Sequence, residues 1–284
     1  MYKIIDGKKI AKTIRENITK EIISLKQKGK NVKLCVIIVG NDPASRIYVN
    51  NKKKACLESQ IDFEEFSMPY DTTKEELIKL IDSLNHDDNV DGILVQLPLP
   101  KHIDEKAVIK QIDPKKDVDA FCEENAGKIM IGNYDLAPGT PAGIIEMLKY
   151  ENIDIKGKNC VVVGRSNIVG KPMALLLLHN DATVTICHSK TTNLKSICKT
   201  ADILISAVGK ANFIKKDMVK DNAVVIDVGM NRDQNNKLCG DVDFDEVSKV
   251  CSYITPVPGG VGPMTIAMLL KNTLTAAKIR MTSK

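Results

Sequence analysis

The chain has 284 residues, of which 43% are hydrophobic and 27% charged, and its net charge at neutral pH is +5. This length and composition predict about two globular domains, each with its own hydrophobic core. Trp is absent and aromatic residues make up only 4%, which argues against a surface for stacking nucleic-acid bases. The small basic excess suits anionic small molecules better than nucleic acid.

The eight cysteines are scattered, and no two have the CxxC spacing of a zinc or redox site. Most lie in apolar runs, which predicts buried, reduced thiols rather than disulfides. The four histidines form no HExxH motif, so no metal site is predicted. The N-terminus lacks a secretory apolar segment, and no apolar run reaches the ~20 residues that a membrane span needs. We therefore expect a cytoplasmic protein without a membrane partner.

The first half of the chain alternates helical and strand patterns. Apolar residues at helical spacing mark a first helix over residues 10–25. Unbroken apolar runs predict buried strands at residues 33–39 and 92–97, and a further strand and helix are expected near 62–67 and 73–85. Such alternation predicts a parallel sheet covered on both faces, whose ligands bind beyond the carboxyl ends of the strands.

A helix that carries a phenol and an amine follows the first buried strand. Asp42 suits its N-cap, and Pro43 suits its first position, where a missing N–H costs nothing. Tyr48 and Lys52 are four residues apart, so they share one face, with Cβ atoms ~5–6 Å apart. Together with Gln96, which also follows a strand end, they are candidates to hold a flat ligand and move a proton. The alternative is an exposed helix face with a lysine-rich end.

A loop-rich passage over residues 113–141 predicts the junction between two domains. A helix near 141–150 follows, and an apolar helix over about 263–279 is expected to return to the first domain. Between these helices, apolar runs predict the strands of a nucleotide-binding sheet at residues 159–163, 183–187, 202–207 and 223–228.

The predicted fold class is α/β, with two α/β domains flanking a cleft and a Rossmann-like parallel sheet in the C-terminal domain. We expect the first domain to span residues 1–139, completed by 263–284, and the nucleotide-binding domain to span 140–262.

The strand that ends at Val163 runs into Gly164-Arg165-Ser166-Asn167-Ile168-Val169-Gly170 and then an apolar helix. Strand, tight turn and helix N-terminus together present backbone N–H groups and a positive dipole end to a phosphate. Ser166 replaces the middle glycine of GxGxxG and Gly170 comes one residue late, so the turn is a relative of the dinucleotide fingerprint. The alternative is that the two glycines merely permit a tight crossover.

The end of the next strand indicates which dinucleotide binds. An NAD site usually carries Asp or Glu there, accepting from the ribose hydroxyls. This chain has Cys187-His188-Ser189-Lys190, and a 2′-phosphate would find donors in Ser189 and the nearby Arg165. We therefore predict NADP, although Ser189 could also cap a helix over about 191–199. The predicted cofactor-binding residues are Gly164, Arg165, Ser166, Ile168, Val169, Gly170, Ser189 and Met230.

Five motifs then occur in order along nearly the whole chain. They are Tyr48–Lys52, Asp91–Pro100, Lys116–Asp119, Gly164–Pro172 and the glycine-rich run Pro256–Thr265. Taken alone, the last motif could be only a helix start with Pro263 at the first helical position. Together, the five resemble the bifunctional methylenetetrahydrofolate dehydrogenase/cyclohydrolase family. The resemblance implies oxidation of methylenetetrahydrofolate to methenyltetrahydrofolate with NADP, hydrolysis to formyltetrahydrofolate, and a homodimer.

The resemblance also implies the roles of individual residues. Asp119 is expected to accept two N–H bonds from the pterin, the alternative being a solvated loop acid like the neighbouring Asp117. The predicted catalytic residues are Lys52, Tyr48, Gln96 and Asp119. The predicted substrate-binding residues are these four with Val95, Leu97, Pro258, Gly259, Gly260, Val261 and Gly262. Two positions depart from the family pattern, Gly139 in place of its cysteine and Ala120 in place of its glycine, and both leave the local backbone shape open.

The two reactions make different chemical demands. Hydride loss from the methylene carbon is driven by a nitrogen lone pair and needs alignment rather than a base. Hydrolysis of the resulting cation needs an acid/base group. Lys52 is the candidate, because burial or a nearby cation would lower its pKa from ~10.4 toward a useful range. Gln96 would position the amine without adding charge, and Tyr48 would stack on the folate and orient the proton.

Three alternatives stay open at this point. A dehydrogenase without hydrolase activity, and a catalytically silent NADP-binding regulatory module, would both be expected to carry lesions among Tyr48, Lys52 and Gln96, and none is present. A nucleic-acid binder is disfavoured because residues 52–54 form the only dense basic run.

Overall fold

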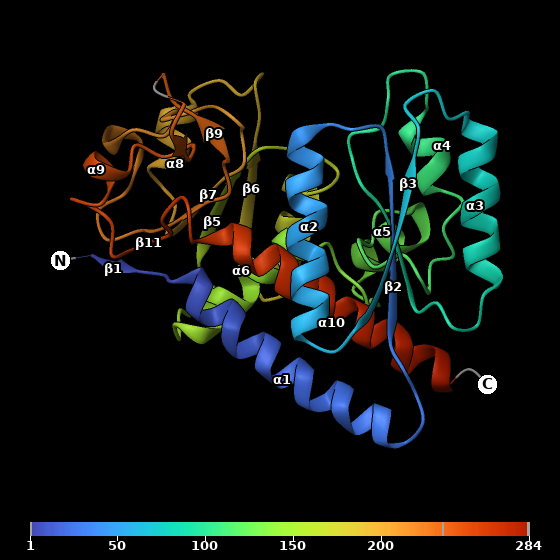
Figure 1. Ribbon diagram of the computed structural model, residues 1–284. Helices are drawn as coiled ribbons and strands as arrows, with labels where there is room; N and C mark the ends of the chain where they lie inside the picture. The colour runs from blue at the N-terminus through green and yellow to red at the C-terminus, as the bar shows by residue number, and fades with distance from the viewer. Residues whose placement is uncertain (1, 235, 283–284) are drawn as a thin grey trace. The chain divides into compact units, whose positions relative to one another are not determined.

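Every strand that the apolar runs predicted is present in the computed structural model, which describes residues 2–234 and 236–282 (Figure 1). The strands are β2 (Lys33–Val39), β3 (Asp62–Met68), β4 (Gly92–Val95), β5 (Asn159–Val163), β6 (Thr183–Cys187), β7 (Ile203–Ser206) and β8 (Val224–Asp227). Their ladders are all parallel, and helices separate them in sequence. The predicted α/β class with parallel sheets is confirmed.

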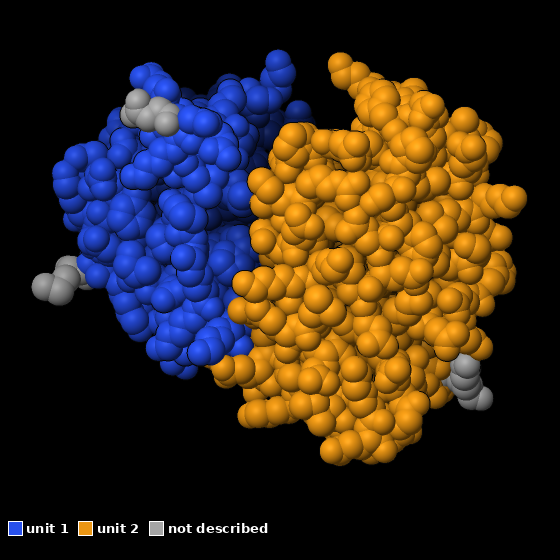
Figure 2. Space-filling model, viewed as in Figure 1, with its two compact units in different colours: residues 1–12, 138–265 blue, residues 13–137, 266–284 orange. Residues whose placement is uncertain are grey.

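The chain divides into two compact units, coloured separately in Figure 2. Unit 1 consists of residues 1–12 and 138–265, and unit 2 of residues 13–137 and 266–284. This division differs from the predicted one at the N-terminus, because residues 1–12 group with unit 1. The reason is β1 (Lys3–Ile4), which pairs in parallel with β11 (Tyr253–Ile254). A two-residue strand has no periodicity by which a sequence could reveal it.

Unit 1 is built on one six-stranded sheet with the order β1-β11-β8-β7-β5-β6. Its central strands are nearly fully buried, and their apolar side chains form a core with Ile214 and Val247. The helical segments of this unit are α6 (Gly139–Tyr150), α7 (Gly170–Leu178), α8 (Leu194–Cys198), η1 (Lys216–Met218) and α9 (Phe244–Val247). A short hairpin, β9 (Asn231–Arg232) with β10 (Leu238–Cys239), follows the sheet strand β8. This is the predicted Rossmann-like arrangement.

Unit 2 is built on a three-stranded sheet with the order β3-β2-β4. Helices α2 (Pro43–Glu58) and α3 (Lys74–His86) connect its strands, and α4 (Glu105–Ile109) and α5 (Glu123–Ile131) follow β4. The long helices α1 (Gly7–Gln27) and α10 (Val261–Thr282) contribute residues to both units. As predicted, the last helix returns to this unit, where Leu269, Leu270 and Leu274 join the core beside Val36 and Ile38 of β2.

Several boundaries differ from the sequence prediction; α6, for example, begins at Gly139 rather than 141. Helix α5 lies inside the passage that was predicted as loop, because Gly132 ends it after only nine residues and its apolar stripe is short. Helix α10 begins at Val261 rather than 263. Helix α8 begins at Leu194, with Asn193 at the N-cap position, so Ser189 does not cap it.

Seven of the eight cysteines are buried, and Cys239 is half-buried. Across the described residues, no helix combines the length and the hydropathy that a membrane crossing requires.

Candidate active site

Helix α2 presents Tyr48 and Lys52 as the sequence predicted. Asp42 is extended (φ −60°, ψ 120°), its Oδ2 accepts from the Ser45 N–H at 2.8 Å, and Pro43 is the first helical residue. The cap fixes where the helix begins and therefore which residues face the core. Val49 is fully buried, whereas Tyr48 is 39% exposed, and burial raises the pKa of its phenol.

The Lys52 ammonium donates to Gln96 Oε1 at 2.8 Å, which joins α2 to the end of β4. Gln96 is held by two further bonds: its N–H donates to the Ile37 carbonyl at 2.8 Å, and its Nε2 donates to the Leu97 carbonyl at 2.6 Å. These bonds fix the amide so that its oxygen, an uncharged acceptor, faces the lysine. Burial lowers the pKa of Lys52, against the opposing influence of the Asp119 and Cys56 charges.

Asp119 is the electrostatic partner of this lysine. Its side chain is half-buried, and burial raises its pKa to about 6, with Lys52 acting in the opposite direction and Asp117 reinforcing the rise. Within the described residues, its carboxylate accepts no hydrogen bond, so its acceptors are open to a ligand. The next residue, Ala120, has φ +55°, the left-handed region that favours glycine. The departure at this position therefore keeps the turn that a glycine would make.

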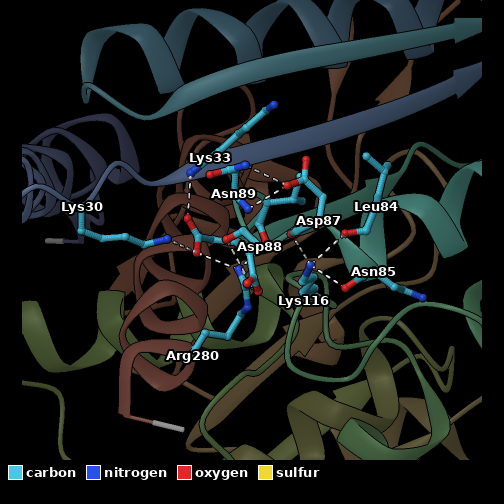
Figure 3. Close-up of polar contacts among 11 residues, drawn as sticks. Lys30, Lys33, Leu84, Asn85, Asp87, Asp88, Asn89, Lys116 and Arg280 are labelled. Carbon is cyan, nitrogen blue, oxygen red and sulfur yellow. Dashed lines mark hydrogen bonds and ion pairs between the residues drawn. The ribbon is translucent and has the colours of Figure 1, made fainter. Parts of the chain in front are cut away.

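The segment that carries Asp119 is anchored residue by residue (Figure 3). Lys116 is only 2% exposed, and its ammonium donates to the carbonyls of Leu84, Asn85 and Asp87 at 2.7–2.8 Å. These are carbonyls at the C-terminal end of α3, which lack partners within the helix. The Lys116 carbonyl accepts from the Ile93 N–H at 2.7 Å, so the segment runs beside β4.

Asp117 also belongs to this anchor, and the expectation that it is a solvated acid was wrong. It is 1% exposed, and its Oδ2 accepts from the Cys122 N–H at 2.9 Å and from Asn125 Nδ2 at 3.1 Å. Its position next to other charged residues in sequence hid this burial. Asn272 of α10 completes the anchor, since its Nδ2 donates to the Val118 carbonyl at 2.8 Å.

Two further predicted substrate-binding residues have apolar side chains in the core of unit 2. Val95 is 5% exposed and belongs to the cluster that covers β4, and Leu97 packs against the same cluster.

In unit 1, the turn between β5 and α7 is shaped by two glycines. Gly164 has φ +138°, and a Cβ on it would lie 2.4 Å from the Ala207 carbonyl oxygen. A Cβ on Gly170 would lie 2.3 Å from the Gly164 oxygen. Ser166 closes the turn, because its Oγ accepts from the N–H groups of Val169 and Gly170 at 3.2 and 3.3 Å. The turn is therefore a close-packed strand–helix junction with the backbone shape of a phosphate cradle.

Other predicted cofactor residues are accessible. Arg165, Ile168, Ser189 and Met230 are exposed, the two apolar side chains by 44% and 50%. The segment after β6 is ordered locally, since the His188 N–H donates to Thr191 Oγ1 at 2.8 Å. Ser189 therefore lies at the tip of the turn. Its side chain is outside the core, and it does not cap a helix.

The glycine-rich run before α10 is bound tightly to the start of α1. The Lys8 N–H donates to the Gly259 carbonyl at 3.1 Å, and a Cβ on Gly7 would lie 1.8 Å from the Gly260 oxygen. Gly259 has φ +107°. Pro258 and Gly262 are exposed, whereas Val261 is buried. Thr140, beside the departure at Gly139, shares a 2.8 Å hydroxyl–hydroxyl bond with Thr265, so the start of α6 is tied to the same run.

Sequence reasoning missed two buried acids at the carboxyl edge of the unit 1 sheet. Asp227 ends β8 and is 3% exposed, and burial raises its pKa to about 6 despite three backbone N–H donors. Asp241 follows the β9–β10 hairpin and is fully buried. An acid at the end of an apolar strand was the available signal for Asp227, whereas Asp241 lies in an acidic loop and gave none.

Comparison with known proteins decides the family. The model of the tetrahydrofolate dehydrogenase/cyclohydrolase catalytic domain matches residues 5–119, and that of the same family's NAD(P)-binding domain matches residues 138–281. This chain belongs to the tetrahydrofolate dehydrogenase/cyclohydrolase family. The predicted enzyme class is confirmed, and with it an NAD(P)-binding C-terminal domain and both activities that the family name carries, rather than a monofunctional or silent protein.

Relatives of this family resemble the chain over its whole length. Bifunctional protein FolD from Acetivibrio thermocellus is 61% identical over 278 residues, which cover 98% of each chain. The crystal structure of the bifunctional FolD enzyme from Campylobacter jejuni has a TM-score of 0.97 at 48% identity, covering 99% of this chain and 100% of that one. The Trypanosoma brucei FolD enzyme, solved with NADP and an inhibitor, has a TM-score of 0.93 at 39% identity, covering 98% of each chain.

Proposed function

We propose that this family member oxidises methylenetetrahydrofolate to methenyltetrahydrofolate with NADP and hydrolyses the product to formyltetrahydrofolate, with Lys52 as the acid/base of the second step. The observation that carries this proposal is the 2.8 Å bond from the Lys52 ammonium to the uncharged Gln96 oxygen. A half-buried lysine whose pKa is lowered by burial, and whose hydrogen-bond acceptor is uncharged, gives up its proton more readily than an exposed lysine.

In the hydrolysis step, water adds to the carbon between the two folate nitrogens and one C–N bond then breaks. Lys52 in its neutral form takes a proton from the attacking water and, as the ammonium, returns one to the leaving nitrogen. Gln96 keeps the amine aimed through both stages because its own amide is held at Ile37 and Leu97. A carboxylate in its place would raise the lysine pKa and weaken the base.

Asp119 binds the amino-pyrimidine edge of the pterin in this proposal. The pterin N–H groups supply the hydrogen bonds that its carboxylate otherwise lacks, and such bonds favour its ionised form. Folate binding thus lowers the raised pKa of Asp119. Tyr48, exposed on the same face of α2 as Lys52, supplies an aromatic surface for the ring and a hydroxyl to orient the proton.

The dehydrogenase step depends on alignment more than on a base. The residues present fit a dinucleotide, since the tight Gly164–Gly170 turn joins β5 to the N-terminus of α7, where a Rossmann-like sheet binds phosphate. Arg165 and Ser189 are exposed donors for a 2′-phosphate, which favours NADP. NADP supplies the hydride acceptor. Pro258 to Gly262 then provide backbone that both ligands can approach closely.

We further propose that the protein works as a cytoplasmic homodimer in one-carbon metabolism, as the family resemblance implies. Size-exclusion chromatography with light scattering tests this assembly directly, because a monomer mass at micromolar concentration contradicts it.

The acid/base assignment is tested with Lys52→Met. Cyclohydrolase kcat should fall by about 10²–10⁴-fold, because the acid/base group is lost, while NADP-dependent oxidation persists at a reduced rate. The exposed neighbour Lys53→Met is the matched control and should leave both activities within about twofold of wild type. Unchanged hydrolysis in Lys52→Met would remove this lysine from the mechanism.

A clear kcat/KM preference for NAD would contradict the assignment of Arg165 and Ser189.

A further inference from the structure

The buried acid Asp241 accepts an unusual number of hydrogen bonds from loops at the carboxyl edge of the unit 1 sheet. Its Oδ2 accepts from the Val208 and Gly209 N–H groups at 2.7 and 3.2 Å, and its Oδ1 accepts from the Lys210 N–H at 2.9 Å. Two side chains complete the set, Ser206 Oγ at 3.2 Å and Asn231 Nδ2 at 2.8 Å. Three successive backbone N–H groups around one anion form a nest. In this chain the nest is occupied by the protein's own carboxylate.

The same carboxylate is connected to the end of β8. The backbone N–H of Asp241 donates to Asp227 Oδ1 at 2.9 Å, and that oxygen also accepts from the Gly229 N–H at 2.9 Å. The Asp227 N–H in turn donates to Thr255 Oγ1 at 2.7 Å, just before the glycine-rich run. Two buried aspartates thereby fix the loops that follow β7, β8 and β11.

The space around the two carboxylates is closed. A Cβ on Gly229 would lie 2.2 Å from Asp241 Oδ1, and a Cβ on Gly240 would lie 1.8 Å from Asp227 Oδ2. The loops therefore have one packing arrangement, and the acids cannot shift to another without breaking it. Neither acid faces solvent, so neither is available to touch a ligand.

These loops lie where a parallel sheet binds its ligand. The carboxyl ends of adjacent strands form the dinucleotide site of a Rossmann-like sheet. Met230, a predicted cofactor residue, is 50% exposed and sits between Gly229 and Asn231, both of which contact the carboxylate network. A change in the network would therefore move Met230 and the predicted cofactor surface to which it belongs.

We propose that Asp241 is a positioning residue for NADP: its buried carboxylate holds the loops after β7 and β8 in the shape that receives the cofactor. The inference rests on the proposed function for the identity of the ligand. It assigns to Asp241 no contact with the cofactor and no proton transfer.

The bifunctional enzyme supplies its own control, because hydrolysis of methenyltetrahydrofolate can be assayed without any nucleotide. Asp241→Asn keeps the size of the side chain but turns one acceptor into a donor that opposes backbone N–H groups. We expect its KM and Kd for NADP to rise by about tenfold or more, while nucleotide-free cyclohydrolase kcat stays within about twofold of wild type. Asp243→Asn is the matched control, since Asp243 pairs with Lys215 outside this network and should leave both activities unchanged.

The outcomes separate the two hypotheses. If the wild-type protein shows no NADP-dependent oxidation, the proposed function fails. If the wild type is active and Asp241→Asn binds NADP normally, the positioning role is refuted. If Asp241→Asn loses both activities together, Ser206→Ala decides, because it removes only one of the five bonds. A raised KM for NADP with normal cyclohydrolase in that variant supports the proposal, and equal loss or no change in the two activities overturns it.

Discussion

In unit 2 the Asp119 carboxylate has a pKa raised to about 6 and, among the described residues, accepts no hydrogen bond, whereas in unit 1 the Asp241 carboxylate accepts five. Asp119 is half-buried and Asp241 is fully buried. The Asp119 carboxylate has acceptor positions that no described residue fills, whereas the acceptor positions of the Asp241 carboxylate are filled. Hydrogen-bond saturation therefore separates the acid proposed to bind a ligand from the acid that holds loops together.

The same contrast holds for the lysines of unit 2. Lys116 donates to three carbonyls and holds the segment in place, whereas Lys52 faces a single neutral amide oxygen and the open carboxylate of Asp119. Burial lowers the pKa of both ammonium groups. Only the lysine with unfilled hydrogen-bonding capacity is suited to proton transfer, because the other, as a neutral amine with two N–H groups, would leave one of its three carbonyls without a donor.

The largest effect is expected where the cofactor site is built from backbone alone. Gly170→Ala places a Cβ 2.3 Å from the Gly164 oxygen, and we expect a loss of about 3 kcal/mol in unfolding free energy and of NADP binding. Gly127→Ala is the control, because a Cβ there meets nothing within 4 Å and lies inside α5. It should stabilise the protein by about 0.5–1 kcal/mol. Chemical denaturation measures both, and a tolerated Gly170→Ala would show that the turn has more space than the structure gives it.

A smaller loss is expected from the saturated lysine. Lys116→Met removes the donor for three carbonyls at the end of α3, at a cost of about 2 kcal/mol in unfolding free energy. Its exposed neighbour Lys115→Met should change stability by no more than about 0.5 kcal/mol. Folate binding should weaken in Lys116→Met alone, because this segment positions Asp119. Equal unfolding curves for the two variants would contradict the anchoring role.

The smallest expected effect concerns the two acids Asp119 and Asp241. Replacing each by asparagine should change the free energy of unfolding in opposite directions. Because burial raises the folded-state pKa of Asp119 from 3.8 to about 6, ionisation costs stability as pH rises through that interval. Asp119→Asn should therefore stabilise the folate-free protein by about 1 kcal/mol at pH 7, after allowing for solvent screening, and by nothing near pH 3. Asp241→Asn should instead destabilise it at pH 7 by about 2 kcal/mol, since five donors lose their anion. Unfolding curves at pH 7 and pH 3 test both expectations. A loss of stability in Asp119→Asn would contradict the distinction between the two acids.

Local sequence patterns were sufficient for most of the framework. Strands β2, β4 and β5 follow directly from unbroken apolar runs, and the Asp42–Pro43 pair identifies the start of α2. These features depend on residues a few positions apart, so a single sequence contains them. The same holds for the four-residue spacing of Tyr48 and Lys52, which places both on one face of a helix whatever surrounds it.

Tertiary structure alone decided the environments of the charged residues. Asp117, Asp119, Asp227 and Asp241 are the same residue type, and their sequence neighbours do not tell them apart. Of these four, only the Asp119 carboxylate accepts no hydrogen bond from the described residues. What separates them is which backbone N–H groups arrive from segments distant in the chain, such as residues 208–210 around Asp241. Placement of β1 beside β11 is equally non-local. Desolvation and hydrogen bonding act through space, so the chemistry of a side chain is settled only when the chain has folded around it.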